Sequence, residues 1–231
     1  MKIYIVGIFA FLATLLMLGF HSDGCKAQTQ ITQRSLSEVR VEKIALMPFL
    51  TGQLESPNAP IAKPLSKPLS QLVLDARGLP EGADGIMNRI VSQALKVRFQ
   101  DRVVSTDHVA EAYQALLMDD QALDTPRKRA IRLGEALEAN LVMVGAVWRY
   151  REKGVFAESP DSPASVGFAL YLVDVETGAR LWRGSFDGTQ KTLSQDVIGS
   201  LKQLNMGLRW LSAEELAQYG LKSVLRKLPL H

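Results

Sequence analysis

Cysteine and histidine are nearly missing from this chain of 231 residues, which holds one cysteine and three histidines. The lone cysteine, Cys25, excludes an internal disulfide bond. Once a leader is removed, only His108 and His231 remain, which is too few for a metal cluster of Cys and His ligands. The chain also lacks a Gly-x-Ser-x-Gly nucleophile elbow and a glycine-rich phosphate loop. These absences argue against catalysis, and we expect no metal and no cofactor.

The chain has little excess charge of either sign, because its 27 Lys and Arg are nearly balanced by 24 Asp and Glu. A nucleic-acid-binding domain would carry a clustered basic stripe, which is not found. The strongest basic cluster is Arg127, Lys128, Arg129 and Arg132, in a helix predicted to begin at Pro126. Its charges oppose the dipole at the start of that helix, so a compensating contact is expected. The cluster is either a solvated face or a docking surface for an acidic partner, an anionic glycan or a lipid head group.

Apolar residues make up 47% of the chain, enough for a real core. Three apolar runs predict strands at Leu141–Trp148, Phe168–Val173 and Ala179–Phe186. The first two are apolar on both faces, which predicts a sheet covered on both sides. The third is more polar and is expected at an edge. The segment Asp174–Gly178 predicts a tight hairpin turn, because Gly178 tolerates a positive φ.

The other predicted elements alternate between strands and helices. They are Val41–Phe49 and Arg102–Ser105 as strands, and Ala83–Phe99, Thr106–Met118, Pro126–Asn140, Thr192–Asn205 and Ser212–Lys227 as helices. Pro48 should end pairing of the first strand, and Asn140 is expected as a left-handed cap. Ser212 and Glu215 form a predicted capping box. This order predicts an α/β fold in three layers, with a mixed sheet flanked by helices.

The helix predicted at 83–99 is amphipathic, with a broad apolar side. Its apolar stripe and the residues that flank it are Ile86, Ile90, Ala94 and Val97, then Met87, Val91 and Leu95. A proline-rich excursion is expected at residues 50–81, because five prolines there forbid a central strand. The excursion is either solvated or a contact segment for a partner.

The N-terminus predicts a secretory signal at residues 1–24, with a positive start, the apolar run Ile3–Phe20 and a small residue before Cys25. A retained transmembrane helix is the alternative. Cys25 is in the place of a lipoprotein acylation site, although Ser22 and Asp23 depart from the usual lipobox; simple secretion is the alternative. Lys26 is not the Asp that retains lipoproteins in the inner membrane, so the outer membrane is expected. Residues 25–40 predict a tether, and residues 41–231 a single domain.

Four segments in order resemble the family of the curli secretion lipoprotein and the penicillin-binding-protein activator lipoprotein. They are IALMPF, RVVS, EALEANLVMVGAV and LYLVDVETGARLW. The resemblance implies a three-layer α/β fold related to the anticodon-binding-like domain, used for protein contacts in the cell envelope without known catalysis. It also implies a protein partner, either a peptidoglycan synthase or another envelope complex.

A membrane pore is not favoured, since the excursion has too many prolines and the segment Arg151–Pro163 is too short and charged for membrane-spanning strands. His108 is expected at the surface, and Asp174 and Glu176 in a turn. The tryptophans are expected in the core or on sheet faces: Trp148, Trp182 and Trp210. We therefore expect a lipid-anchored periplasmic protein of the outer membrane that binds a protein. The alternatives are a subunit of an export or surface-organelle assembly and, third, a periplasmic enzyme.

Overall fold

The computed structural model describes residues 39–55, 65–72, 79–118, 124–154, 162–189 and 211–230. Several predicted features lie outside these residues: the signal, Cys25, most of the tether, the helix at 192–205, Trp210 and His231. Among the described residues, no helix is both long enough and apolar enough to cross a bilayer.

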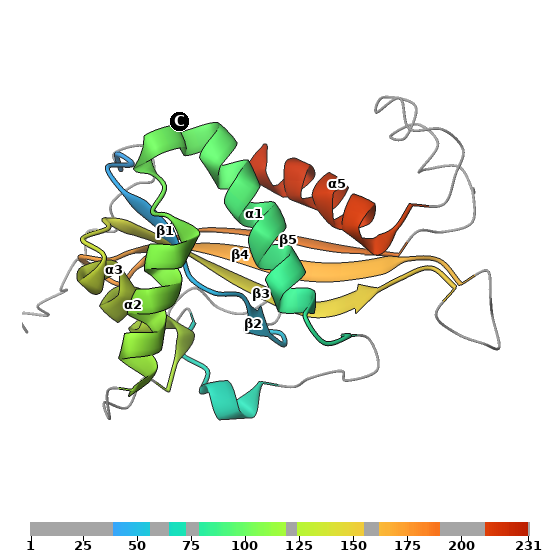
Figure 1. Ribbon diagram of the computed structural model, residues 1–231, viewed down its shortest axis with the longest axis horizontal. Coiled ribbons are helices and arrows are strands. Elements are labelled where there is room, and N and C mark those ends of the chain that lie inside the picture. The colour runs from blue at the N-terminus through green and yellow to red at the C-terminus, as the bar shows by residue number, and fades with distance from the viewer. Residues whose placement is uncertain are drawn as a thin grey trace, which may run out of the picture. The chain divides into compact units, whose positions relative to one another are not determined.

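The described strands form one mixed sheet (Figure 1). Its strands are β1 (Ile44–Leu46), β2 (Leu50–Thr51), β3 (Leu141–Arg151), β4 (Ser165–Asp174) and β5 (Arg180–Thr189). β1 and β2 both pair with β3 in parallel, whereas β3, β4 and β5 form an antiparallel meander. The order β1-β3-β4-β5 leaves β5 at an edge of the described sheet, which confirms the prediction from its polar residues.

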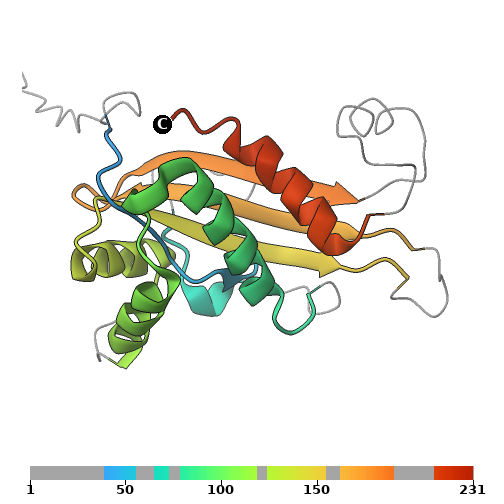
Figure 2. The same cartoon turned by 45° about the horizontal axis from the view of Figure 1, so that its top comes forward.

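The helices cover both faces of this sheet (Figure 1, Figure 2). They are α1 (Ala83–Phe99), α2 (Thr106–Met118), α3 (Pro126–Ala136) and α5 (Ala213–Leu225), with the short 3-10 helices η2 (Leu69–Gln71) and η3 (Gln100–Arg102). α1 and α5 pack on one face, and α2 and α3 on the other. The predicted three-layer α/β architecture is confirmed.

Alternation along β4 explains why the sheet needs two covering layers. Phe168, Leu170 and Leu172 belong to the core beneath α1 and α5. Ala169, Tyr171 and Val173 belong to the core beneath α2 and α3. Successive side chains of a strand point to opposite faces, so a strand that is apolar at every position must be buried on both.

The first predicted strand is split in two around Pro48. Met47 still donates its N–H to Met143 O at 3.0 Å, and pairing resumes at Leu50. The predicted strand at 102–105 is wrong, because the chain forms η3 up to Arg102. Only Val103 then makes an isolated bridge, to Ile44.

Asn140 is not the left-handed residue after α3, so that prediction is also wrong. Glu138 has the positive φ, at 51°. Asn140 instead uses its amide to fasten the chain before β1. Its Oδ1 accepts from the N–H of Lys43 at 2.9 Å, and its Nδ2 donates to Arg40 O at 2.7 Å. A side chain with both donor and acceptor atoms can satisfy two backbone groups of a neighbouring segment.

Leu54 and Leu65 of the proline-rich excursion are buried in the second core, so a purely solvated excursion is wrong at these positions. Leu54 and Leu65 are 2% and 1% exposed. Glu55 lies beneath them, where its carboxylate pairs with Arg180 of β5 and accepts from the N–H of Leu65 at 2.8 Å. Leu65 O in turn accepts from the N–H of Arg127 at the start of α3.

Tyr171 of β4 is expected to lower the stability of the folded protein at alkaline pH. Burial raises the pKa of the Tyr171 phenol to about 12. The phenol ionises near pH 10 in the unfolded chain, so the contribution of Tyr171 to stability is unchanged below pH 10 and is lost as the pH rises from 10 to 12. We expect Tyr171 to account for a loss of about 1 kcal/mol at pH 11. Urea unfolding at pH 9 and pH 11 measures the loss, and Tyr171→Phe should fall less steeply than the wild type. An equal fall in both proteins contradicts the assignment.

Candidate functional site

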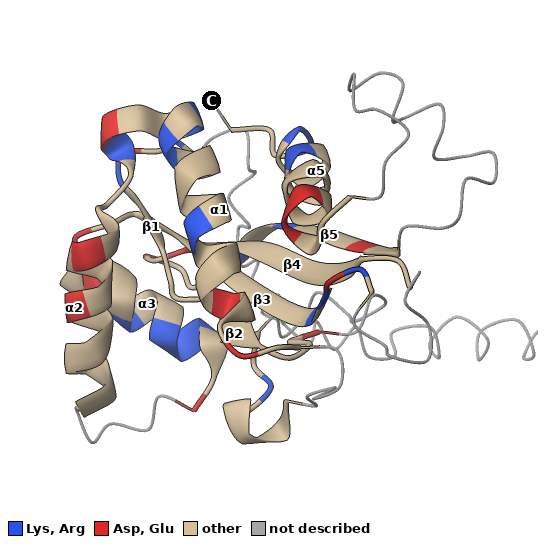
Figure 3. Cartoon of the chain, turned by 45° about the vertical axis from the view of Figure 1, so that its right-hand side comes forward, with Lys and Arg blue, Asp and Glu red and all other residues tan. Residues whose placement is uncertain are grey.

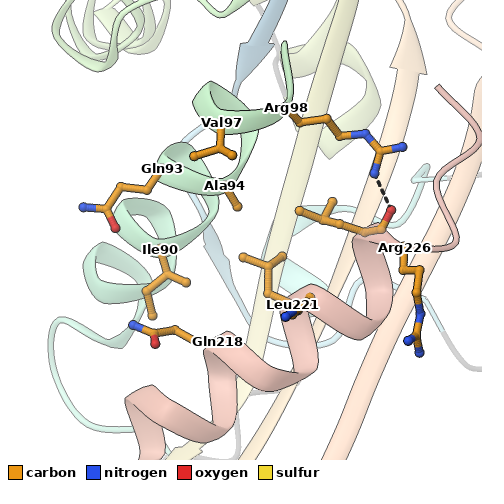
Figure 4. Close-up of a pocket in the computed structure, with 10 residues that line it drawn as sticks. Ile90, Gln93, Ala94, Val97, Arg98, Gln218, Leu221 and Arg226 are labelled. Carbon is orange, nitrogen blue, oxygen red and sulfur yellow. Dashed lines mark hydrogen bonds between the residues drawn. The ribbon is translucent and has the colours of Figure 1, made fainter. Parts of the chain in front are cut away.

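An apolar groove of about 740 Å³ lies between α1 and α5 (Figure 4). From α1 it is lined by Ile90, Gln93, Ala94, Val97 and Arg98. From α5 it is lined by Gln218, Leu221, Lys222, Leu225 and Arg226. Figure 4 shows Ala94 and Leu221 pointing into the space between the two helices. Val97 is 83% exposed, an unusual position for a large apolar side chain.

The breadth of the apolar side of α1 creates one wall of this groove. Met87, Val91 and Leu95 are fully buried against the sheet. The second stripe, Ile90, Ala94 and Val97, is rotated toward α5, and its burial falls from Ile90 to Val97. A helix with two apolar stripes needs two contacts, and the sheet supplies only one.

The other wall exists because α5 lies very close to β5. A Cβ atom at Gly220 of α5 would come within 2.5 Å of the Phe186 ring, and one at Gly184 of β5 within 2.6 Å of Val224. The centroid of the Phe186 ring also lies 5.8 Å from the ring centroid of Phe168 and 6.3 Å from that of Tyr219. These two glycines allow α5 to pack closely on the meander, which leaves space on its α1 side.

Arginines of α1 join the two helices at both ends of the groove. Arg89 pairs with Glu214 in the first turn of α5 at 3.0 Å. Arg98 donates to the carbonyl of Leu225, the last residue of α5, at 2.6 Å and to that of Leu228, beyond the end of α5, at 2.6 Å. The Leu225 carbonyl also accepts from the N–H of Leu228 at 3.0 Å, so Arg98 adds a second hydrogen bond to it. These contacts connect α1 to α5 near the two ends of the groove.

The groove is positively charged at the end where the C-termini of α1 and α5 lie. Figure 3 shows Lys and Arg gathered near the C-terminal ends of α1 and α5. Arg98, Lys222 and Arg226 line the groove, and none of its ten lining residues is Asp or Glu. Lys222 and Arg226 are exposed and form no ion pair within the part of the chain that the structure describes.

The ten residues that line the groove include no Ser, Thr, Cys, His, Asp or Glu, and Lys222 supplies the one amine among them. In the described ranges, no three side chains of His, Cys, Asp or Glu gather closely enough to hold a metal ion.

The predicted basic cluster lies on α3, and the structure gives each of its members a partner inside the protein. Lys128 pairs with Asp124 at 2.9 Å, and this contact lowers the pKa of the Asp124 carboxyl. Arg132 pairs with Glu135 at 3.2 Å. Lys128 and Arg132 nevertheless stay exposed. Whether the cluster is a docking surface stays a prediction.

The other two members of the cluster hold neighbouring elements. Arg129 donates to the hydroxyl of Tyr113 on α2 at 2.8 Å. Arg127 lies against the β4–β5 turn and donates to Thr177 O at 3.4 Å. The expected compensation at this helix start is supplied for Lys128 by the Asp124 carboxylate. Thr125 also caps the N–H of Lys128, and Leu65 O accepts from that of Arg127.

The remaining predicted residues lie outside the groove. Asp174 and Glu176 form the expected turn, in which Asp174 Oδ1 accepts from the N–H of Glu176 at 3.1 Å and Gly178 has a φ of 64°. His108 is exposed in the first turn of α2. Trp148 and Trp182 are partly buried against the two cores, as predicted.

Sequence reasoning did not single out the groove, although one signal for it was present. Val97 belongs to the apolar stripe predicted for α1. The sequence alone does not show that α5 leaves this residue exposed. Lys222 and Arg226 had no sequence signal of their own, since basic residues are common in the last turn of a helix.

No protein-family model and no curated protein sequence matches this chain. Among solved structures it is similar to a PelC dodecamer from Paraburkholderia phytofirmans, with a TM-score of 0.45 and 15% identity, covering 84% of this chain and 91% of that one. It is similar to lipoprotein GNA1162 from Neisseria meningitidis, with a TM-score of 0.42 and 19% identity, covering 70% and 93%. It is also similar to the C-terminal domain of LpoB from Salmonella enterica, with a TM-score of 0.38 and 15% identity, covering 66% and 86%. At these values the likeness does not extend to function.

Proposed function

We propose that this protein is a lipoprotein anchored at the periplasmic face of the outer membrane by Cys25, and that it binds a protein partner without catalysis of its own. The α1–α5 groove is the binding site. By the resemblance to envelope lipoproteins, the partner is a peptidoglycan synthase or another envelope complex.

The observation that carries this proposal is the groove itself. It exposes a preformed apolar surface between two helices, with Val97 almost fully in solvent. Exposed apolar surface costs free energy in water, and a contact that covers it recovers about 25 cal/mol for each Å². Apolar surface rimmed by polar residues marks interaction sites in soluble domains. The polar rim here is formed by Gln93 and Gln218 with the basic residues.

Photocrosslinking from Val97 tests the proposal. With Val97 replaced by the photoreactive amino acid benzoylphenylalanine, irradiation of living cells is expected to join the protein to another envelope protein. Mass spectrometry of the adduct then identifies the partner. A synthase and a subunit of an export assembly would give adducts of different identity.

Met118 on α2 supplies the matched control, because it is a large apolar residue that is 85% exposed on a different helix. The same replacement at Met118 should give no such adduct. Adducts of equal yield from both positions, or none from Val97, would contradict binding through the groove.

A further inference from the structure

The chemistry of the groove indicates what kind of partner segment enters it. We infer that the α1–α5 groove binds an acidic amphipathic helix of a partner protein. This inference rests on the proposed function, and it adds the secondary structure and the charge of the bound segment.

The shape of the groove favours a helix of two to three turns. The lining runs from Ile90 to Arg98 on one side and from Gln218 to Arg226 on the other. At a rise of 1.5 Å per residue, each wall is about 12 Å long, or roughly two turns. A helix of that length presents two or three apolar side chains at i, i+3 and i+4 spacing to such a groove.

The walls also disfavour an extended segment. α1 and α5 use their backbone N–H and C=O groups within the helices, and Arg98 donates to the carbonyl of Leu225 at the end of α5. An extended peptide gains affinity by adding its backbone hydrogen bonds to an open sheet edge, and neither helix offers one. The bound segment must therefore satisfy its own backbone groups, which a helix does.

The charge of the groove favours acidic residues on that helix. Arg98 is occupied by carbonyl groups. Lys222 and Arg226 line the groove and remain exposed. The opposite end has the Arg89–Glu214 pair, which contributes no net charge. Basic side chains here also suit the dipoles of the two helix ends, but carboxylates at the rim would pair with them as well.

An anionic lipid surface would also attract the basic residues of the groove, but unlike a helix it does not fit the shape of the groove. The apolar lining is recessed between two helices, and Val97 is the only one of its apolar side chains that is largely exposed. A flat lipid surface would contact Val97 and the basic rim while leaving the partly buried Ala94 uncovered. A helix that enters the groove covers both side chains.

Two synthetic peptides of 14 residues test the inference. Both carry leucines at the same helical spacing, one with glutamates and the other with lysines at the remaining charged positions. Fluorescence anisotropy measures their binding to the full mature chain that carries Cys25→Ser and needs no detergent. We expect the acidic peptide to bind about tenfold more tightly than the basic one.

Substitutions test whether the acidic peptide binds in the α1–α5 groove. Val97→Asp should weaken the acidic peptide at least fivefold, whereas Met118→Asp should leave it unchanged. The pair Lys222→Glu and Arg226→Glu should reverse the preference between the two peptides, whereas Lys128→Glu with Arg132→Glu on α3 should not. Unchanged melting temperatures exclude unfolding as the cause.

Several results would overturn the inference. Equal binding of the two peptides, or no binding of either, rules out an acidic helix. Binding to phosphatidylglycerol vesicles that is lost in Val97→Asp, with no preference between peptides, assigns the groove to lipid. A dimer that Val97→Asp dissociates in sedimentation assigns it to a second copy. If photocrosslinking from Val97 still yields a partner in any of these cases, only this inference fails and the proposed function stands.

Discussion

Glu55→Ala is expected to destabilise the fold by about 3–5 kcal/mol, because it leaves the guanidinium of Arg180 buried without a counter-charge. The side chains of Glu55 and Arg180 are 7% and 9% exposed. The change also removes the acceptor of the Leu65 N–H, so the excursion loses its attachment to β5. Urea unfolding of the full mature chain measures the loss.

Two further variants distinguish the cost of a buried unpaired charge from the cost of losing an ion pair at the surface. Replacing both partners by apolar residues, Glu55→Leu with Arg180→Met, should recover only part of the loss, because the charge of Arg180 is removed while the Leu65 N–H still lacks its acceptor. Glu135→Ala breaks the exposed pair with Arg132 and should cost less than about 1 kcal/mol. A loss below 1 kcal/mol for Glu55→Ala would show that the pair is solvated.

Gly145→Val is the second change with a large expected effect, a loss of about 3 kcal/mol from overpacking. Gly145 lies in the middle of β3, and a Cβ atom there would come within 2.2 Å of the Phe49 ring. Phe49 is itself 5% exposed in the core beneath α1 and α5, so it has little room to move. Thermal unfolding followed by circular dichroism measures the effect.

A second glycine supplies the contrast. Gly85 lies inside α1, where a Cβ atom would meet nothing within 4 Å. Gly85→Ala should therefore stabilise the protein by about 0.5–1 kcal/mol through helix propensity alone. Adding Phe49→Ala to Gly145→Val should cost less than the sum of the two single changes, because they share one contact. Strict additivity would show that Phe49 is not the obstacle.

Elements with strong local signals could be predicted from the sequence. The helix at Ala83–Phe99 and the three strands of the meander follow from apolar periodicity and turn residues, and the structure confirms them. The capping box of Ser212 and Glu215 is present as predicted, with both hydrogen bonds formed. In each of these cases the residues that carry the signal lie within a few positions of one another in the sequence.

Features that depend on distant residues could not be predicted in this way. Asn140 was predicted as a cap from its position after α3, but its amide holds a segment about 100 residues earlier. Glu55 pairs with Arg180, which is 125 residues away. The groove requires α1 and α5 side by side, and the residues that pair across it, Arg89 and Glu214, are 125 positions apart. Each of these contacts depends on the sheet that brings the partners together.

The anchor is the part of the account that the rest depends on, because a partner in the envelope is relevant only if the domain is held there. Mass spectrometry of the N-terminal peptide of the protein from purified outer membranes tests this most directly. We predict that the mature chain begins at Cys25 and carries the mass of attached acyl chains. A peptide that still contains Met1 and Lys2, or an unmodified Cys25 on a protein recovered from the cytosol, would contradict the account.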